Sequence, residues 1–100
     1  MSVLVKIHQA YREIVAVCDK DLLGKKFEQG DRQLEVNERF FGGEEMQDDK
    51  IIELLKEKAE DDACFNFVGK KAVELGAKAD IIDEKRVLKI QKVPIAMSLF

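Results

Sequence analysis

The sequence is poor in the residues that build metal sites and disulfide frameworks. Its 100 residues include one histidine, two cysteines, one proline and no tryptophan. One histidine excludes a metal site that needs several imidazole ligands from a single chain. Cys18 and Cys64 stand far apart and form no C-x-x-C pair, so we expect small thiols, and a reducing compartment argues against a disulfide between them. The sequence therefore predicts neither a bound metal nor a cofactor.

Long hydrophobic runs are also absent. The chain begins MSVLVKIHQAYRE, where Lys6 interrupts the apolar run and the sequence turns polar by His8. A signal peptide needs a longer unbroken apolar segment after a basic start. No window approaches the roughly 18 apolar residues of a membrane span. We therefore expect a cytoplasmic protein with no membrane partner.

The residues that are present suit one globular domain. The apolar fraction is 46% and the charged fraction 37%, so we expect a single domain over residues 1–100. The formal net charge is −3, but the charge is unevenly distributed. Residues 44–62 carry three basic and nine acidic residues, whereas residues 63–100 carry seven basic and four acidic ones. The negative net charge argues against a protein that coats nucleic acid non-specifically. The excess of basic residues in the C-terminal third is still compatible with a local basic face there.

The first twenty residues predict a β-hairpin. VLVKIHQ alternates apolar Val3, Val5 and Ile7 with other side chains, which is the pattern of a half-buried strand. EIVAVCD is β-branched and almost wholly apolar, as expected of a more central strand. Because the connection between them is short, we expect the two strands to pair antiparallel.

Further elements follow along the chain. QLEVN predicts a short strand with Leu34 and Val36 on one face. Apolar residues recur at one-turn spacing over roughly residues 48–61, which predicts an amphipathic helix. Residues 86–91 read as a strand, and Pro94 is expected to break the ladder or to mark an edge.

A second helix is predicted over about residues 66–75, with Asn66 as its N-cap and Gly76 as its C-terminal stop. The prediction rests on a stripe at spacings of 3, 4, 3 and 4, made by Phe65, Val68, Ala72, Leu75 and Ala79. The resulting order is β-β-β-α-α-β. We therefore expect an α+β fold, a single small domain in which a mixed sheet with an N-terminal β-hairpin carries two helices.

Two segments share the run Gly-Lys-Lys: LLGKKFEQG at residues 22–30 and VGKKAVELG at residues 68–76. Neither contains G-x-x-x-x-G-K-[ST], so a phosphate loop of the ATPase type is not predicted. The first glycine is expected to bend the chain after a strand, and close packing is the first explanation for the second. Lysines and a glycine near a helix N-terminus can nevertheless hold an anion. The candidate anion- or RNA-binding residues are Asn66, Gly69, Lys70, Lys71, Gly24 and Lys25.

Catalytic constellations are weak. The only histidine, His8, could approach Cys18 across the predicted hairpin, but it lies on the strand face opposite Val3, Val5 and Ile7, so we expect it to be exposed to solvent. No other nucleophile and base, and no set of metal ligands, emerges from the spacing. The sequence thus leans against an enzyme, although it does not decide the matter.

The segments AVCDKDLLGKKFEQGDRQLEV, FFGGEE, NFVGKKAVELG and VLKIQKVPIAM together resemble an archaeal family known as domain of unknown function 424. The resemblance covers essentially the full length. It implies a small archaeal protein in a housekeeping context, with RNA association as a loosely implied role. It implies no particular reaction, substrate or cofactor.

Two functions are expected on these grounds. The first is an RNA-binding or translation-associated accessory protein, whose partner would be RNA or a ribonucleoprotein. Its basis is the set Lys70, Lys71, Lys78, Lys85, Arg86, Lys89 and Lys92. The second is a homo-oligomeric interaction module without catalytic activity, in which the apolar segment VPIAMSLF beside an edge strand would pair with a second copy.

Overall fold

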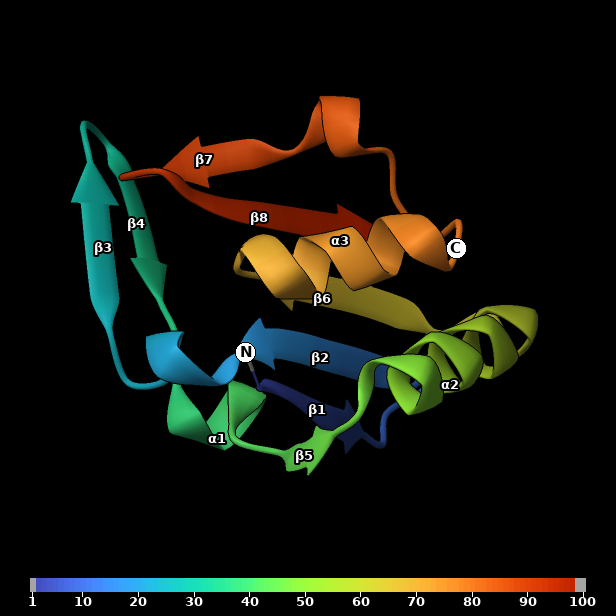
Figure 1. The fold of residues 1–100 in the computed structure, drawn as a ribbon. Coiled ribbons are helices and arrows are strands. Elements are labelled where there is room, and N and C mark those ends of the chain that lie inside the picture. The colour runs from blue at the N-terminus through green and yellow to red at the C-terminus, as the bar shows by residue number, and fades with distance from the viewer. Residues whose placement is uncertain (1, 99–100) are drawn as a thin grey trace.

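A six-stranded mixed sheet forms the frame of the computed structural model, which describes residues 2–98 (Figure 1). The strand order is β5 (Glu44–Met46), β1 (Val3–His8), β2 (Ile14–Asp19), β6 (Cys64–Val68), β8 (Val93–Ser98) and β7 (Leu88–Ile90). Strands β2 and β6 are parallel, and every other neighbouring pair is antiparallel. The two shortest strands, β5 and β7, therefore form the opposite edges of the sheet.

Both faces of the sheet are covered, but by different elements. Helices α2 (Asp48–Glu60) and α3 (Lys70–Lys78) pack on one face. The other face carries the short helix α1 (Glu38–Phe41) and a separate hairpin of β3 (Lys26–Gln29) and β4 (Arg32–Glu35) (Figure 1). Two 3₁₀ turns, η1 (Lys20–Leu22) and η2 (Glu84–Arg86), follow β2 and precede β7.

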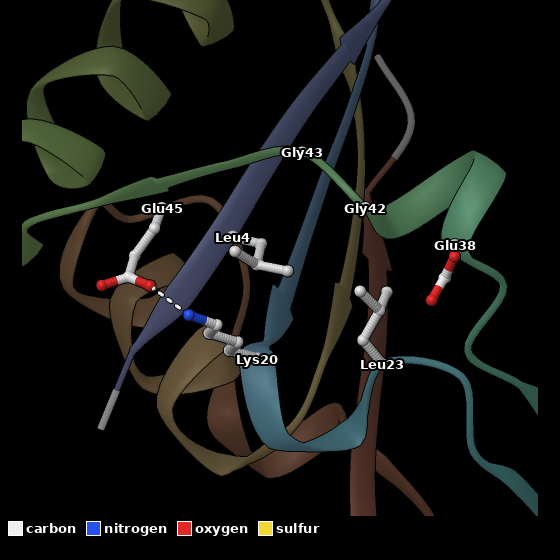
Figure 2. A pocket seen from close by; sticks show the side chains of 7 residues that line it. All are labelled: Leu4, Lys20, Leu23, Glu38, Gly42, Gly43 and Glu45. Atoms are coloured by element: carbon white, nitrogen blue, oxygen red, sulfur yellow. Dashed lines mark hydrogen bonds and ion pairs between the residues drawn. The ribbon is translucent and has the colours of Figure 1, made fainter.

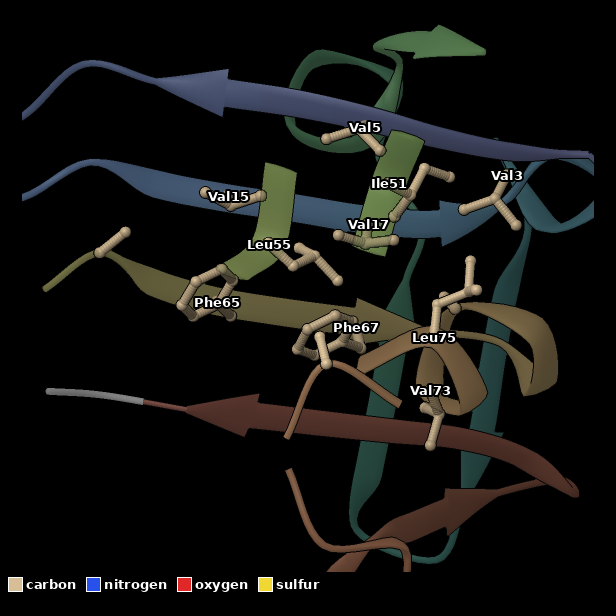
Figure 3. Packing of buried hydrophobic residues seen from close by; sticks show 13 residues of the cluster. Val3, Val5, Val15, Val17, Ile51, Leu55, Phe65, Phe67, Val73 and Leu75 are labelled. Atoms are coloured by element: carbon tan, nitrogen blue, oxygen red, sulfur yellow. The ribbon is translucent and has the colours of Figure 1, made fainter. Parts of the chain in front are cut away.

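Alternation along the strands divides the core into two clusters. In β2, Val15 and Val17 face the two long helices, whereas Ala16 and Cys18 face α1 and the hairpin. Figure 3 shows the helix-side cluster, in which Ile51 of α2 packs beside the valines of β1 and β2. Because successive side chains point to opposite faces, a strand buried on both sides is expected to be apolar, and β2 is apolar from Ile14 to Cys18.

The structure confirms the α+β class, the mixed sheet, the N-terminal hairpin and the two helices. The hairpin pairs Val3 with Asp19 and His8 with Ile14. Helix α2 begins and ends within one residue of the range predicted for the first of the two helices. The order β-β-β-α-α-β is incomplete, because it omits β3, β5, β6, β8 and α1.

The predicted second helix has the wrong boundaries. Residues Cys64–Val68 form strand β6, so Asn66 lies in mid-strand and is not an N-cap, and Gly76 lies inside α3 and does not end it. Phe65 and Phe67 are both fully buried on the helix side of the sheet. A spacing of two places both rings on one face of a strand, and the helical stripe arose because Phe65 and Val68 of β6 happen to continue the spacing of the true helix.

Pro94 was expected to break a ladder or to mark an edge, and it does neither. It lies within β8, which pairs with β6 on one side and with β7 on the other. Its carbonyl accepts a hydrogen bond from the Gly69 N–H, while the Gly69 carbonyl is already bonded to the Val73 N–H of α3. The proline's missing donor therefore leaves no neighbouring acceptor unsatisfied.

Candidate functional site

The second Gly-Lys-Lys segment forms the N-terminus of α3, and a buried carboxylate caps it. Asp19 ends β2 and is 4% exposed. Its two oxygens accept hydrogen bonds from the Ala72 N–H at 2.8 Å and the Lys71 N–H at 3.2 Å. Because β2 and β6 are parallel, both strands end at the same edge, and α3 begins beside Asp19. The protein thus fills the anion position at this helix N-terminus with its own side chain.

Gly69 is required where β6 turns into α3. Its φ is +108°, a region that favours glycine, and a Cβ atom there would lie 2.4 Å from the Asp19 Cγ atom. The close approach that was inferred for this glycine is therefore an approach to Asp19.

Burial raises the pKa of the Asp19 carboxyl above its ordinary value, although the N–H groups of Ala72 and Lys71 act in the opposite direction. The nearby Asp21 carboxylate reinforces the increase, and the Lys71 ammonium opposes it. The carboxyl is a structural group, because its oxygens are directed at the helix and are buried there.

The structure brings together only part of the predicted anion site. Gly69, Lys70 and Lys71 are adjacent, but the Lys71 ammonium is 2.7 Å from Asp48 of α2. The Asn66 side chain points to the sheet face opposite α3, since it alternates with the buried phenylalanines.

Gly24 and Lys25 lie in the exposed connection between η1 and β3. The chain bends at Gly24, as expected, and the Gly24 N–H donates a hydrogen bond to the Val36 carbonyl. Neither residue lines the cleft to which Lys70 belongs. Binding of an anion at the six predicted residues stays a prediction.

Five cations of the C-terminal third are exposed and form no ion pair within residues 2–98: Lys70, Lys85, Arg86, Lys89 and Lys92. They lie on the first residue of α3, on η2, on β7 and in the turn after it. We call this set the basic edge. Lys71 and Lys78 do not belong to it, because they pair with Asp48 and Glu74.

A cleft of about 470 Å³ opens beside Lys70 of the basic edge, between α3 and the η2–β7 segment. Its lining comprises Lys70, Val73, Glu74, Lys78, Glu84, Val87 and Pro94. We call it the α3 groove. Its apolar residues are Val73, Val87 and Pro94, and its four charged residues carry both signs.

A second cleft, of about 440 Å³, lies where η1, α1 and β5 meet (Figure 2). Leu4 and Leu23 are its apolar lining, and the Gly42–Gly43 backbone forms one wall. Its only lysine, Lys20, is 2.8 Å from Glu45 and so is already neutralised. This cleft therefore has no free cation for a phosphate.

The structure keeps His8 and Cys18 apart. His8 is paired with Ile14 and Cys18 with Leu4, so they differ by four positions along β1, about 13 Å. The His8 Nε2 atom lies 2.8 Å from the Phe40 carbonyl oxygen, and burial raises the pKa of the Cys18 thiol to about 12. Residues 2–98 also hold no group of three or more His, Cys, Asp or Glu side chains placed to hold a metal ion.

A family model described as "Protein of unknown function (DUF424)" matches residues 7–99. The chain belongs to this family. A crystal structure described as that of an uncharacterized conserved protein from Methanopyrus kandleri is similar to this DUF424 chain, with a TM-score of 0.87 and 25% identity over 97% of this chain and 90% of that one. No curated protein matches. Within residues 2–98, no helix has both the length and the apolar character to cross a bilayer.

Sequence reasoning missed Asp19 and Glu84. An acidic residue directly after an apolar strand could have indicated Asp19, but its helix partner is 53 residues away. Glu84 belongs to the α3 groove only because η2 folds back over α3, and no local pattern encodes that return.

We predict that Gly69→Ala lowers the free energy of unfolding by about 3 kcal/mol, because it combines a strained φ with a clash against the α3 cap. Urea unfolding followed by circular dichroism measures the change. Gly30→Ala is the matched control, since Gly30 also has a positive φ, +62°, but has no atom within 4 Å of the added Cβ. It should cost about 1 kcal/mol. Equal costs would show that contact with Asp19 is irrelevant.

The Asp19 pKa predicts a pH dependence. A carboxyl whose pKa is higher in the folded state binds its proton more tightly there, so its contribution to stability falls as pH rises above about 4, the ordinary aspartate value. The difference in unfolding free energy between the wild type and Asp19→Asn should therefore shrink over that range. Urea titrations at successive pH values measure it, and a difference that grew with pH would mean that the hydrogen bonds outweigh burial.

Proposed function

We propose that this protein binds RNA, alone or within a ribonucleoprotein, through the basic edge, and acts as an accessory protein without catalytic activity. The observation that supports the proposal is the separation of charge across the sheet. The acidic residues of the segment 44–62 follow one edge strand, β5, and continue along α2. Four of the five residues of the basic edge lie just before, in or just after β7, which is the opposite edge strand (Figure 1).

This separation matters because the net charge is only −3. A protein with evenly mixed charges would repel a polyanion weakly from every side. Here the acidic strand β5 is at the opposite edge of the six-stranded sheet from β7, and Asp48 of α2 is already paired with Lys71, so RNA approaching β7 meets the unpaired cations first. Phosphate contacts by exposed lysine and arginine are the general source of affinity for nucleic acids.

Self-association is a second candidate, favoured by two exposed apolar side chains. Leu88 is 50% exposed and Met97 is 69% exposed. Leu88 is paired with Ile95, two residues before Met97, so both side chains lie on the same sheet face. A second copy could cover them.

The test is an anisotropy titration of labelled structured RNA at about 50 mM and 200 mM salt. With about five phosphate contacts, affinity should fall by about a hundredfold or more between the two concentrations, because each contact releases counterions. Light scattering on the same samples reports the mass. No binding at low salt would refute the proposal, and a doubled mass without RNA binding would support self-association instead.

Paired variants locate the interface. Lys85→Gln with Lys89→Gln removes two charges from the basic edge, and should weaken binding and lower the slope of log affinity against log salt by about two. Lys50→Gln with Lys56→Gln removes the same charge from exposed positions of α2 and is the matched control. Equal effects of the two pairs would mean that the RNA does not select the β7 edge.

A further inference from the structure

We propose that the α3 groove holds one unpaired guanine nucleotide of the bound RNA. The inference rests on the proposed function and adds a base preference to it. Val73 is almost fully buried, while Val87 and Pro94 are partly exposed, and together they present an apolar surface between α3 and β7. A flat base that has left its helix can cover such a surface, as unstacked bases do on apolar or aromatic side chains.

The groove has a lysine at each end of α3 that can contact phosphates of the bound strand. Lys70 and Lys78 are the first and last residues of α3, so they stand about 12 Å apart along the helix axis. Lys70 has no ion pair within residues 2–98, whereas Lys78 is held 3.2 Å from Glu74. Lys89 is paired with Pro94 and so extends from the helix side of the sheet beside the groove. The Lys70 end of the groove therefore has two lysines, Lys70 and Lys89, that form no ion pair within residues 2–98.

Glu84 supplies the base preference. It is exposed, it lines the groove, and it makes no hydrogen bond or ion pair within residues 2–98. The cap of η2 is provided by Asp83, which accepts from the Lys85 N–H, so the Glu84 carboxylate is not used there. A carboxylate only accepts hydrogen bonds, and its two oxygens match two adjacent donors. Guanine offers such a pair, N1–H and the N2 amino group, whereas adenine, cytosine and uracil place an acceptor beside any donor on that edge. The groove should therefore favour guanine.

The experiment compares labelled uridine-rich single strands that carry one central guanine, adenine or inosine. Guanine should bind about tenfold more tightly than adenine, the scale of a paired hydrogen-bond contact to a base, and inosine should fall between them because it lacks the N2 amino group. Glu84→Gln should remove the preference while raising affinity for all three strands, since it removes a negative charge near the phosphates.

Glu53→Gln is the matched control, because Glu53 is an exposed residue of α2 on the acidic side. It removes the same charge and should leave the preference for guanine intact. Salt-sensitive binding with equal affinity for the three strands would overturn the guanine site and leave the proposed function standing. A preference that survived in Glu84→Gln would also overturn it. No binding of these strands by a protein that binds structured RNA would likewise overturn the guanine site, whereas failure to bind either kind of RNA at low salt would refute RNA binding itself.

Discussion

The contact between Asp19 and the first turn of α3 joins the two halves of this fold. It connects the end of β2 to the helix that follows β6, and Gly69 is the residue that lets the two approach. The carbonyl of Gly69 begins α3 while its N–H bonds to Pro94 of β8. Three strands and a helix are thereby fixed at one point, and the position of the α3 groove depends on that point.

Local sequence patterns predicted the elements whose periodicity is complete within one segment of the chain. The N-terminal hairpin and α2 were found because alternation and one-turn spacing are complete within each segment. Strand β6 was missed because CFNFV is short and leads directly into a helix, so Phe65 fits both periodicities. Strands β5 and β7 have three residues each, too few for a pattern, and pairing with a longer neighbour defines them.

The candidate site was less predictable than the fold. Sequence placed the basic residues in the C-terminal third, but it could not say that Lys71 is paired with Asp48 of another helix. The pair between Glu74 and Lys78 has i,i+4 spacing within α3, but the helix predicted over residues 66–75 ended before Lys78. The first pair depends on how α2 packs against α3. Nor could it show that the acidic strand β5 and the strand β7 form opposite edges of the sheet, because that follows from the strand order. Residue types therefore indicated the kind of ligand, and topology selected the surface.

The distance in sequence between Asp19 and its helix has a consequence for the order of folding. The N-terminal hairpin needs only neighbouring residues, so it can form as soon as it leaves the ribosome. The cap of α3 joins Asp19 to Ala72, which are 53 positions apart. The Gly69 N–H can donate to the Pro94 carbonyl only after β8 has docked on the sheet. The α3 groove is thus completed only when the last strand docks, and a partly folded or truncated chain would display its lysines without the surface that arranges them.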